Sequence, residues 1–529
     1  MRVRKAARVS AAILLVLFTV FSAFWGVAGA QGAEPAGPPP NSLLVQGFRF
    51  TGNDSIESWM LQDVVSHAVG QYLDIDGLYA LADQVTTFYR QQGYWLARAY
   101  LPEQVVTDGV VLIGVVEGRY GNVEIESRAN VPQELGPRIL RDVGPGDVVY
   151  GPRLESAILL ISDVPGVEAS ASLSPGSEPG TADLHVVLHP VERFVAVWTA
   201  NNHGSSAEKS FRSILNARWE NPRGYGDHFS FTIFGGSSGS FFGRAAYEAP
   251  VNHRELRLNL AYSVSQYKLA NEFAVLDGSG DTRRFSVTAN HPVLRAGRIN
   301  VLGEVGYAHT QMQERLLTAE SSRTVSGFSS ALRAEWQGTG GKTISAALEV
   351  RAGSVKFGTG ADAAFDAAGP KTAGDFQKAT GTVTVTQPFG AGKTVQASAS
   401  WQWASKNLDP TEKLTLGGPE GVRAYTTDAP SVDEGWLGHL EVRRQLNLRR
   451  LPWLRAASLF VDVGQGQVNK APWPGAGETG RVTLAGAGVG FAWAWDRLNG
   501  EVAYALPVSF GGEAPEAGGR LWWEANWQF

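Results

Sequence analysis

The chain has 529 residues, with 46 Lys and Arg against 51 Asp and Glu, a formal net charge of -5, and no Cys. At 18% charged and 43% hydrophobic residues it is too apolar for a disordered chain, and its length suggests about two to four folding units. The lack of Cys excludes disulfide frameworks, thiolate nucleophiles and Cys-ligated zinc or iron–sulfur sites. The near-neutral charge argues against binding of nucleic acid.

The first 30 residues predict a secretory signal peptide. Basic residues without any acid precede the apolar stretch 13–25, and Ala28-Gly29-Ala30 supplies a small-residue cleavage site. The apolar stretch is short for a helix of about 20 residues that spans a membrane, although an uncleaved membrane anchor is the alternative. We therefore expect residues 1–30 to be removed, with a mature chain that begins at Gln31. The basic residues are Arg2, Arg4, Lys5 and Arg8.

A Pro/Gly-rich linker over 31–41 precedes a small α+β domain, which we predict at 42–118. Its first strand covers 43–52, with Leu44, Gln46, Phe48 and Phe50 on one face. Two helical patterns follow, and strand-like runs at 95–101 and 110–117 complete a β-α-α-β-β order. The helical patterns cover 55–69 and 78–89, with Asp76 as a possible cap and Gly93 as the end of the second helix.

The same order of elements recurs over 119–189, which predicts an internal repeat of the small domain. The expected elements are a strand at 123–126, helices near 134–142 and 153–163, and strands at 167–173 and 183–188. A three-stranded sheet with helices on one face has an open edge, and such an edge can accept an extended strand of a partner. The alternative is that the two small domains are inert spacers that bind no partner.

From residue 190 onward, apolar and polar residues alternate strictly. Leu215, Ala217 and Trp219, for example, alternate with Asn216 and Arg218. Such a pattern fits a soluble sandwich, and it also fits a transmembrane barrel whose apolar face meets lipid. The even number of strand-like runs favours a 16-stranded antiparallel barrel over 190–529. The runs are 193–201, 210–220, 226–234, 240–249, 254–269, 283–292, 297–309, 326–337, 342–357, 378–387, 394–405, 435–446, 455–464, 482–495, 499–510 and 520–529.

The connections between these runs alternate between short turns and long loops, as in outer-membrane barrels. Short turns include 221–225 and 388–393, and the longest loop, the sixth, covers 406–434. The last run carries aromatic residues at 523, 527 and 529 on one face. The terminal Phe529 resembles the C-terminal signal of outer-membrane proteins. Sixteen strands enclose a water-filled bore unless something fills it, which predicts a plugged lumen.

The sequence offers no convincing catalytic or metal-binding motif. Gly235 to Gly239 matches G-x-S-x-G formally, but it joins two alternating runs, whereas a nucleophile elbow needs a following helix. No H-E-x-x-H pair, P-loop or dinucleotide fingerprint is present. We therefore predict no catalytic residue, no cofactor, no metal site and no enzyme activity.

Several motifs resemble known families. The order of the two small domains, with Gly93-Tyr94, Tyr100-Leu101-Pro102 and 116–119, resembles the POTRA domain of outer-membrane protein translocators. The segment 416–425 in the longest loop resembles the sixth-loop motif of the Omp85 superfamily. The resemblance is specifically to the outer-membrane transporters of two-partner secretion, the hemolysin and filamentous-hemagglutinin secretion proteins. The turn 221–227 adds to this similarity.

The resemblance also implies site residues. In that family the sixth loop folds back into the barrel, and its Arg pairs with an Asp on the thirteenth strand. Here the Arg is Arg423 and the Asp is Asp462, which lies on the thirteenth run counted above. Ala424 replaces the family's Gly, so the loop is expected to pack differently if the backbone needs a positive φ there. The matched loop residues are Gly421, Val422, Arg423, Ala424 and Tyr425.

The function implied by the resemblance is export of one large β-rich partner, such as a hemolysin or adhesin, across the bacterial outer membrane. The implied partners are the secreted protein docking on the POTRA domains in the periplasm, outer-membrane lipid, and periplasmic chaperones and barrel-assembly machinery during biogenesis. We expect the protein to be a monomer and to bind no nucleic acid. Because Pro38 to Pro40 oppose a helix, we expect no plug helix and the sixth loop as the main obstruction. A barrel-assembly factor of the same superfamily and a passive porin are the alternatives.

Overall fold

The computed structural model describes residues 41–129, 131, 135–205, 210–236, 239–251, 256–269, 271–474, 480–509 and 518–529. The predicted signal peptide and all but the last residue of the predicted linker lie outside the described residues. The chain divides into two compact units, one of residues up to 89 with 97–116, the other of 90–96 with 117–529. Among the described helices, none is long and apolar enough to cross a membrane.

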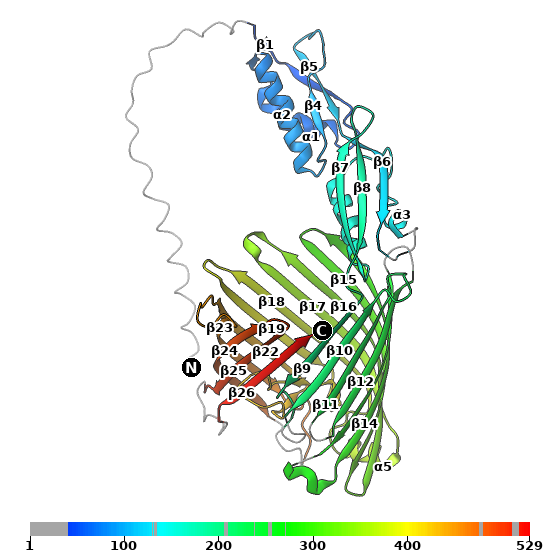
Figure 1. Cartoon of the computed structure of the whole chain (residues 1–529), viewed down its shortest axis with the longest axis vertical. Helices are drawn as coiled ribbons and strands as arrows, with labels where there is room; N and C mark the ends of the chain where they lie inside the picture. Colours follow the sequence, from blue (N-terminus) through cyan, green and yellow to red (C-terminus); the bar gives the residue numbers. More distant parts are fainter. Residues whose placement is uncertain are drawn as a thin grey trace, which may run out of the picture. The chain divides into compact units, whose positions relative to one another are not determined.

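The first unit contains a three-stranded sheet in the order β2-β5-β4, with β2 parallel to β5 and β4 antiparallel to it. Two helices, α1 and α2, accompany the sheet (Figure 1). This is the β-α-α-β-β order that the sequence predicts, apart from a short extra pair, β1 with β3. The elements are β1 (Leu43–Leu44), β2 (Gly47–Thr51), α1 (Ser58–Val65), η1 (Ser66–Ala68), β3 (Tyr72–Leu73), α2 (Ile75–Gln91), β4 (Arg98–Tyr100) and β5 (Val110–Val116).

Two local predictions for this unit are wrong. The run 43–52 is split between β1 and β2, so Gln46 is exposed while its neighbour Val45 is fully buried. Asp76 lies in the first turn of α2, and Asp74 instead accepts a hydrogen bond from the Gly77 backbone nitrogen at 2.9 Å. The N-terminal capping role therefore belongs to Asp74, because its carboxylate satisfies an otherwise unpaired helical N–H.

A second three-stranded sheet belongs to the second unit, in the order β6-β8-β7. Strand β6 is parallel to β8, and β7 is antiparallel to it. Apolar residues of α4 and β8 fill the core, among them Leu154, Ile161, Leu184 and Val186. Residue 134, where the first helix of this repeat is predicted to begin, lies outside the described residues. The elements are β6 (Arg119–Ser127), α3 (Leu135–Ile139), α4 (Gly151–Ser162), β7 (Val167–Pro175) and β8 (Thr181–Pro190).

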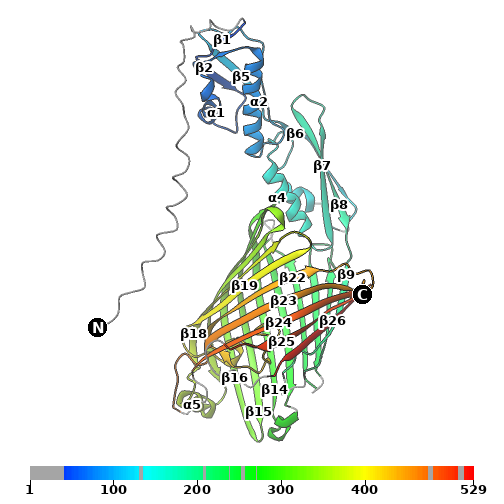
Figure 2. The same ribbon diagram turned by 90° about the vertical axis from the view of Figure 1, so that its left-hand side faces the viewer.

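The remaining long strands form one closed antiparallel barrel (Figure 1, Figure 2). Its sixteen strands fall on the sixteen predicted runs, which confirms the predicted fold class. Each strand pairs with its neighbours, and β26 pairs with β9 to close the barrel. The strands are β9 (Phe194–Asn201), β10 (Arg212–Glu220), β11 (His228–Gly236), β12 (Phe241–Pro250), β13 (Arg257–Lys268), β14 (Ser279–Ala296), β15 (Ile299–Leu316), β16 (Ala319–Gln337), β17 (Thr343–Phe357), β18 (Gly374–Pro388), β19 (Lys393–Ala404), β22 (Glu434–Gln445), β23 (Leu454–Gln467), β24 (Arg481–Trp495), β25 (Leu498–Pro507) and β26 (Arg520–Gln528).

The alternation along each strand separates an inner face from a lipid-facing one. On β23, Leu459 and Val461 are exposed on the outside of the barrel, whereas the polar residues Ser458 and Asp462 are buried inside it. Apolar side chains outward and polar ones inward are what a barrel with a wet lumen requires in a bilayer. The arrangement follows from the period of two, because successive side chains of a strand point to opposite faces.

The strands differ greatly in length. Strands β14 and β15 have 18 residues each and β16 has 19, whereas β9 has 8 and β26 has 9. The predicted run 283–292 covers only the middle of β14. Polar residues and Gly at the ends of the long strands hide the alternation there, so the sequence underestimates their length.

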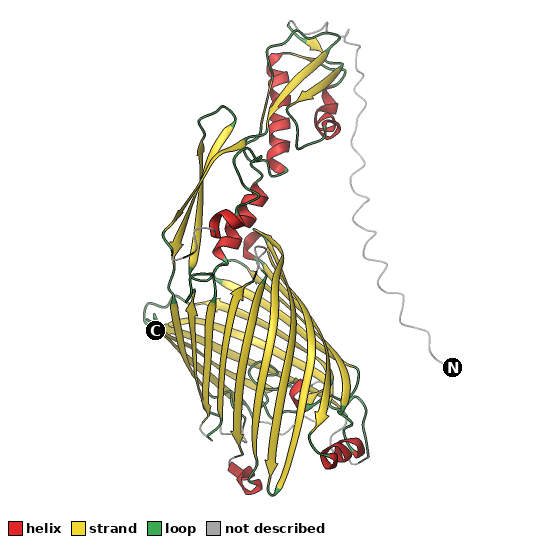
Figure 3. Cartoon of the chain, turned by 90° about the vertical axis from the view of Figure 1, so that its right-hand side faces the viewer, coloured by secondary structure: helices red, strands yellow, loops and turns green. Residues whose placement is uncertain are grey.

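Short elements occupy the connections. Helix α5 (Gly360–Ala368) begins after Thr359, whose side chain accepts a hydrogen bond from the Asp362 nitrogen, and it lies at one end of the barrel (Figure 2). Figure 3 shows short helices, in red, at that end of the yellow barrel strands. The short pair β20 (Leu414–Thr415) with β21 (Ser431–Val432) lies within the sixth loop. The 3-10 turns are η2 (Asn271–Leu276), η3 (Thr339–Gly341) and η4 (Pro410–Glu412).

Candidate functional site

The sixth loop, residues 406–434 between β19 and β22, packs against the inner wall of the barrel. Its residues Leu416, Val422 and Ala424 have no exposed surface. They form one apolar cluster with wall residues such as Phe460 and Leu484. A hairpin pair, β20 with β21, organises the base of the loop. The loop is thus a folded element with its own core, and it lies inside the lumen.

Arg423 and Asp462 form the central contact of the loop. The Arg423 Nε donates to Asp462 Oδ2 and its Nη2 to Oδ1, both at 2.8 Å. The Arg423 backbone nitrogen also donates to Oδ2, at 3.1 Å. Asp462 has no exposed surface. A planar guanidinium matches a carboxylate in this two-point geometry, so the pair fixes the orientation of the loop as well as its position.

Three more wall residues hold Arg423. Its Nη1 donates to Glu441 Oε2 at 3.0 Å, and its guanidinium lies over the Phe460 ring, 3.3 Å from the ring centre. Its carbonyl oxygen accepts a hydrogen bond of 2.6 Å from Trp522 Nε1. The partners come from β22, β23 and β26, so one side chain and its backbone bridge three strands. A cation over an aromatic face adds attraction that a flexible surface Arg lacks.

Asp462 has a second partner on the wall. His439, its direct neighbour across the β22–β23 register, places Nδ1 3.0 Å from Asp462 Oδ1. Glu441 accepts hydrogen bonds from Arg443, which reaches Glu501 at 2.9 Å. Because buried charges are costly unless they are paired, this chain of partners explains how several ionised groups coexist in the lumen.

The Ala at position 424 fits the loop. The φ angle of Ala424 is not positive, so the backbone at this position does not need Gly. A Cβ placed on Gly486 of β24 would lie only 2.6 Å from the Ala424 Cβ. Because Gly486 has no side chain, the wall leaves room for the methyl group of Ala424. Gly421 is more restricted, since a Cβ there would lie 2.4 Å from the Leu416 carbonyl oxygen.

The first arm of the loop, residues 406–413, is tied to other strands. Asp409 pairs with Arg323 of β16 at 2.6 Å. Glu412 pairs with Lys378 of β18 at 2.7 Å, and its Oε1 lies 3.3 Å from Arg351 Nε on β17. The sequence analysis missed these pairs. Two acids at the start of a long loop were the available signal, but their partners lie tens of residues away on strands whose register is not visible in the sequence.

Asp433 closes the base of the loop. It has no exposed surface and accepts hydrogen bonds from the backbone nitrogens of Leu408 and Lys470, at 3.0 and 2.8 Å. Lys413 Nζ lies 3.2 Å from its Oδ1. One carboxylate thus joins both ends of the sixth loop to the segment after β23, so a shift of the whole loop has to break these contacts.

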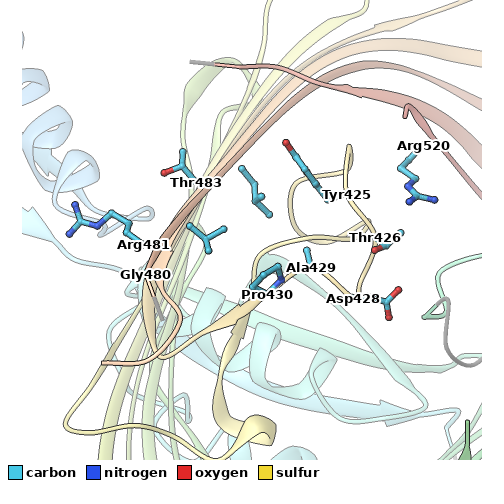
Figure 4. Close-up of a pocket in the computed structure, with 11 residues that line it drawn as sticks. Tyr425, Thr426, Asp428, Ala429, Pro430, Gly480, Arg481, Thr483 and Arg520 are labelled. Atoms are coloured by element: carbon cyan, nitrogen blue, oxygen red, sulfur yellow. The ribbon is translucent and has the colours of Figure 1, made fainter. Parts of the chain in front are cut away.

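Tyr425, the last residue of the motif, lines a cavity of about 580 Å³ between the loop and strands β24 and β26 (Figure 4). Loop residues Thr426, Asp428 and Pro430 line it from one side, as Figure 4 shows, and Arg520 of β26 lines it too. Tyr425 itself is 8% exposed. The cavity leaves free space beside the loop.

Phe529 continues the pairing of β26 with β9. Its backbone nitrogen donates to the Ala196 carbonyl oxygen at 3.0 Å, and its ring is exposed. Inside the barrel, Thr199 Oγ1 donates to Asn526 Oδ1 at 2.7 Å across the same seam. The last residues therefore help to close the barrel.

The remaining motifs have structural roles or lie outside the described residues. In the turn 221–227, buried Asp227 accepts a hydrogen bond of 2.7 Å from Tyr247. Ser237 and Ser238 of the G-x-S-x-G match lie outside the described residues, and the strand β12 follows them. His185 and His189 have H-x-x-x-H spacing, but on the strand β8 this separates them by about 13 Å. No group of three metal ligands occurs among the described residues.

The family model of the haemolysin secretion/activation protein ShlB/FhaC/HecB matches residues 180–493, and the ShlB-type POTRA model matches 43–118. The heme/hemopexin transporter protein HuxB of Haemophilus influenzae is 24% identical over 468 residues, which cover 86% of this chain and 81% of HuxB. The outer membrane transporter CdiB of Escherichia coli is 24% identical over 474 residues, 84% of this chain and 76% of CdiB.

Solved structures show the same architecture. CdiB from Escherichia coli has a TM-score of 0.76 at 21% identity, and the match covers 94% of this chain and 93% of that one. BamA from Haemophilus ducreyi lacking POTRA domains 1–3 has a TM-score of 0.51 at 14% identity, covering 92% and 100%. These likenesses concern the fold.

The family model covers more than half of the chain, and the resemblance suggested by the sequence is confirmed. The predicted outer-membrane location and the predicted role in protein export are confirmed with it. The chain belongs to the haemolysin secretion/activation protein family ShlB/FhaC/HecB, the outer-membrane transporters of two-partner secretion.

Proposed function

We propose that the chain exports one specific, large β-rich partner of the haemolysin or adhesin type, and that the sixth loop gates its passage. The observation that carries the proposal is the bidentate pair of Arg423 with Asp462 inside a closed barrel. An ionic contact on the wall of a wet lumen fixes the loop, and water hydrates the two charges again when the loop moves away, which lowers the cost of breaking the contact. Gly421, Val422, Ala424 and Tyr425 shape the loop around that Arg.

The partner docks first on the POTRA domains by strand addition. Strand β7 lies at an edge of its sheet, and β4 lies at an edge of the other. Side chains of Ser170, Ala171 and Ser172 in the middle of β7 are small and exposed. Small side chains let an extended peptide approach the edge closely, so that main-chain hydrogen bonds supply affinity.

Transport then needs no chemical reaction. The sixth loop shifts away from its wall contacts, the unfolded chain passes through the polar lumen in extended form, and folding outside the cell gives the direction. No residue acts as a catalyst and no cofactor takes part, so the protein is a transporter and not an enzyme.

The domain boundaries and biogenesis complete the proposal. A signal peptide at 1–30 and a linker at 31–41 precede POTRA domains at 42–118 and 119–189, and the barrel covers 190–529. The apolar outer face contacts lipid, and Phe529 directs the chain to periplasmic chaperones and the barrel-assembly machinery. The transporter works as a monomer and binds no nucleic acid.

One feature favours a second candidate, an outer-membrane assembly factor whose substrate leaves through the seam. The register of β26 with β9 covers only Glu524–Gln528 against Val197–Asn201, which is short for this barrel. Against it, inward side chains such as Thr199 and Asn526 reinforce the same seam. Export through the lumen is therefore the better supported function.

The test is a comparison of secreted proteins by mass spectrometry in wild-type cells, a deletion strain and an Arg423→Ala strain. Loss of one large protein from the medium in both mutants supports the proposal. The matched control is Arg481→Ala, which should leave secretion unchanged. Arg481 is exposed and lines the cavity beside Tyr425, close to the sixth loop. A general fall in outer-membrane proteins would favour the assembly factor, and no change in either mutant would favour a passive porin.

A further inference from the structure

A second group of cationic side chains lies on the inner wall, apart from Arg423. Arg244 of β12, Arg284 of β14 and Arg351 of β17 line one cavity of about 340 Å³. Hydroxyl side chains surround them, and Glu349 supplies the single carboxylate among the described lining residues. The Ser and Thr residues of the lining are Ser263, Ser286, Thr288 and Ser329. We call these three arginines the arginine cluster.

Arg351 is buried and poorly satisfied. It is 6% exposed, and its Nε and Nη2 have no hydrogen-bond partner among the described residues. The Glu412 carboxylate lies 3.3 Å from Nε without hydrogen-bond geometry, and its other oxygen pairs with Lys378. Leaving buried charged donors unpaired is unfavourable, so this position suits an additional anionic acceptor.

The geometry of the lining selects the kind of ligand. Guanidinium groups bind carboxylates and phosphates through two parallel hydrogen bonds, and nearby hydroxyls add further donors. A polypeptide in transit presents such groups as the carboxylates of its Asp and Glu residues. We propose that the arginine cluster is a binding site for the acidic side chains of the exported chain, an inference that rests on the proposed function.

The sixth loop controls access to this site. Glu412 belongs to the loop, and it places its carboxylate at the edge of the arginine cluster. When the loop shifts, that carboxylate leaves Arg351, and carboxylates of the exported chain replace it. The loop thus acts as a mobile competitor, and the cluster is free of it only while the path is open.

The experiment measures binding of fluorescently labelled hexaglutamate to the full-length protein in detergent micelles, by anisotropy at fixed ionic strength. The Arg284→Gln, Arg351→Gln double variant should bind about tenfold more weakly, because charge-assisted hydrogen bonds are lost. Glu412→Gln should bind more tightly, by about threefold or more, since the competing carboxylate is gone. Arg218→Gln is the matched control, because Arg218 faces the lumen and pairs with Glu220 at 2.7 Å.

Equal weakening in the Arg218→Gln control would overturn the proposal, because diffuse lumen charge would then explain the binding. Absence of hexaglutamate binding to the wild type, with inorganic phosphate bound instead, would assign the cluster to a small anion and overturn the peptide assignment. Heat-modifiable migration on gels verifies that each variant is folded, and the single Arg284→Gln variant replaces the double one if that fails to fold. Unchanged secretion on deletion of the gene would refute the proposed function separately.

Discussion

Arg423 of the sixth loop and Asp462 of strand β23 are joined by three hydrogen bonds, two from the guanidinium and one from the backbone nitrogen of the same residue. The backbone contact means that the carboxylate defines the path of the loop as well as the position of one side chain. Substitution of Arg423 removes two of these bonds and leaves the third, whereas substitution of Asp462 weakens all of them.

Asp462→Asn should therefore loosen the loop, because it weakens the side-chain and the backbone contacts of Arg423 together. Removing one partner of a buried, hydrogen-bonded pair costs about 3 kcal/mol. We expect more frequent channel openings in planar bilayers and faster protease cleavage within 416–425. The exposed pair of Arg315 with Glu320 supplies the control, since Glu320→Gln should change neither measurement. Openings as rare as in the wild type would contradict a holding role for Asp462.

Gly486→Ala should displace the loop through a steric clash. The added Cβ would lie 2.6 Å from the Ala424 Cβ, on a wall strand that cannot easily move. Overpacking of this kind costs about 1–3 kcal/mol. The double variant with Ala424→Gly restores the space, so its channel openings should return toward the wild-type frequency. Failure of this rescue would mean that the two positions do not pack against each other.

Arg323→Gln should release the first arm of the sixth loop. Arg323 is the partner of Asp409 at 2.6 Å, and both side chains are mostly buried. Because this pair lies on β16 and the Arg423 pair on β23, we expect the effects of Arg323→Gln and Asp462→Asn on channel opening to add in the double variant. If the double variant opened no more often than either single variant, the two contacts would act as one unit.

A disulfide across the seam should leave export intact. Thr199 and Asn526 are direct partners in the β9–β26 register, a spacing of about 5 Å that Cys residues can bridge. The chain has no Cys, so Thr199→Cys with Asn526→Cys forms a defined link. Secretion should be equal under oxidising and reducing conditions. Loss of secretion on oxidation alone would indicate exit through the seam.

Tyr120 should make the second POTRA-like domain sensitive to alkaline pH. Burial raises the pKa of Tyr120 to about 12, from the usual value near 10. Above pH 10 the unfolded chain loses this proton and the folded chain keeps it, so stability falls as pH rises from about 10 to 12. Urea unfolding of the full chain between pH 9 and 12 should show a smaller loss in Tyr120→Phe than in wild type.

Much of the fold could be predicted from local patterns. The period of two gave every barrel strand, because alternation between lipid and lumen is imposed on each strand separately. The ends of β14 and the assignment of Asp74 over Asp76 could not be predicted, because polar strand ends and one-residue shifts of a helix start leave little periodic signal.

The candidate site divides in the same way. Arg423 and Asp462 lie in recognisable motifs, so their meeting could be anticipated from resemblance. The pairs of Asp409 with Arg323 and of Glu412 with Lys378 depend on how a long loop lies across distant strands. That register is a tertiary property, and no spacing in the sequence encodes it visibly.

The unequal strand lengths give the barrel an uneven fit to its bilayer. At about 3.4 Å per residue, the 18-residue strand β14 is about 60 Å long, whereas the 9-residue β26 is about 30 Å long. Tilted strands of about 9–11 residues are needed to cross the hydrocarbon layer, so the 9-residue β26 spans it with no excess and the 8-residue β9 falls short of it. Lipid next to these two strands must therefore thin or reorganise to cover their apolar surface, while lipid next to β14 does not. The thinnest membrane around the transporter lies beside the seam.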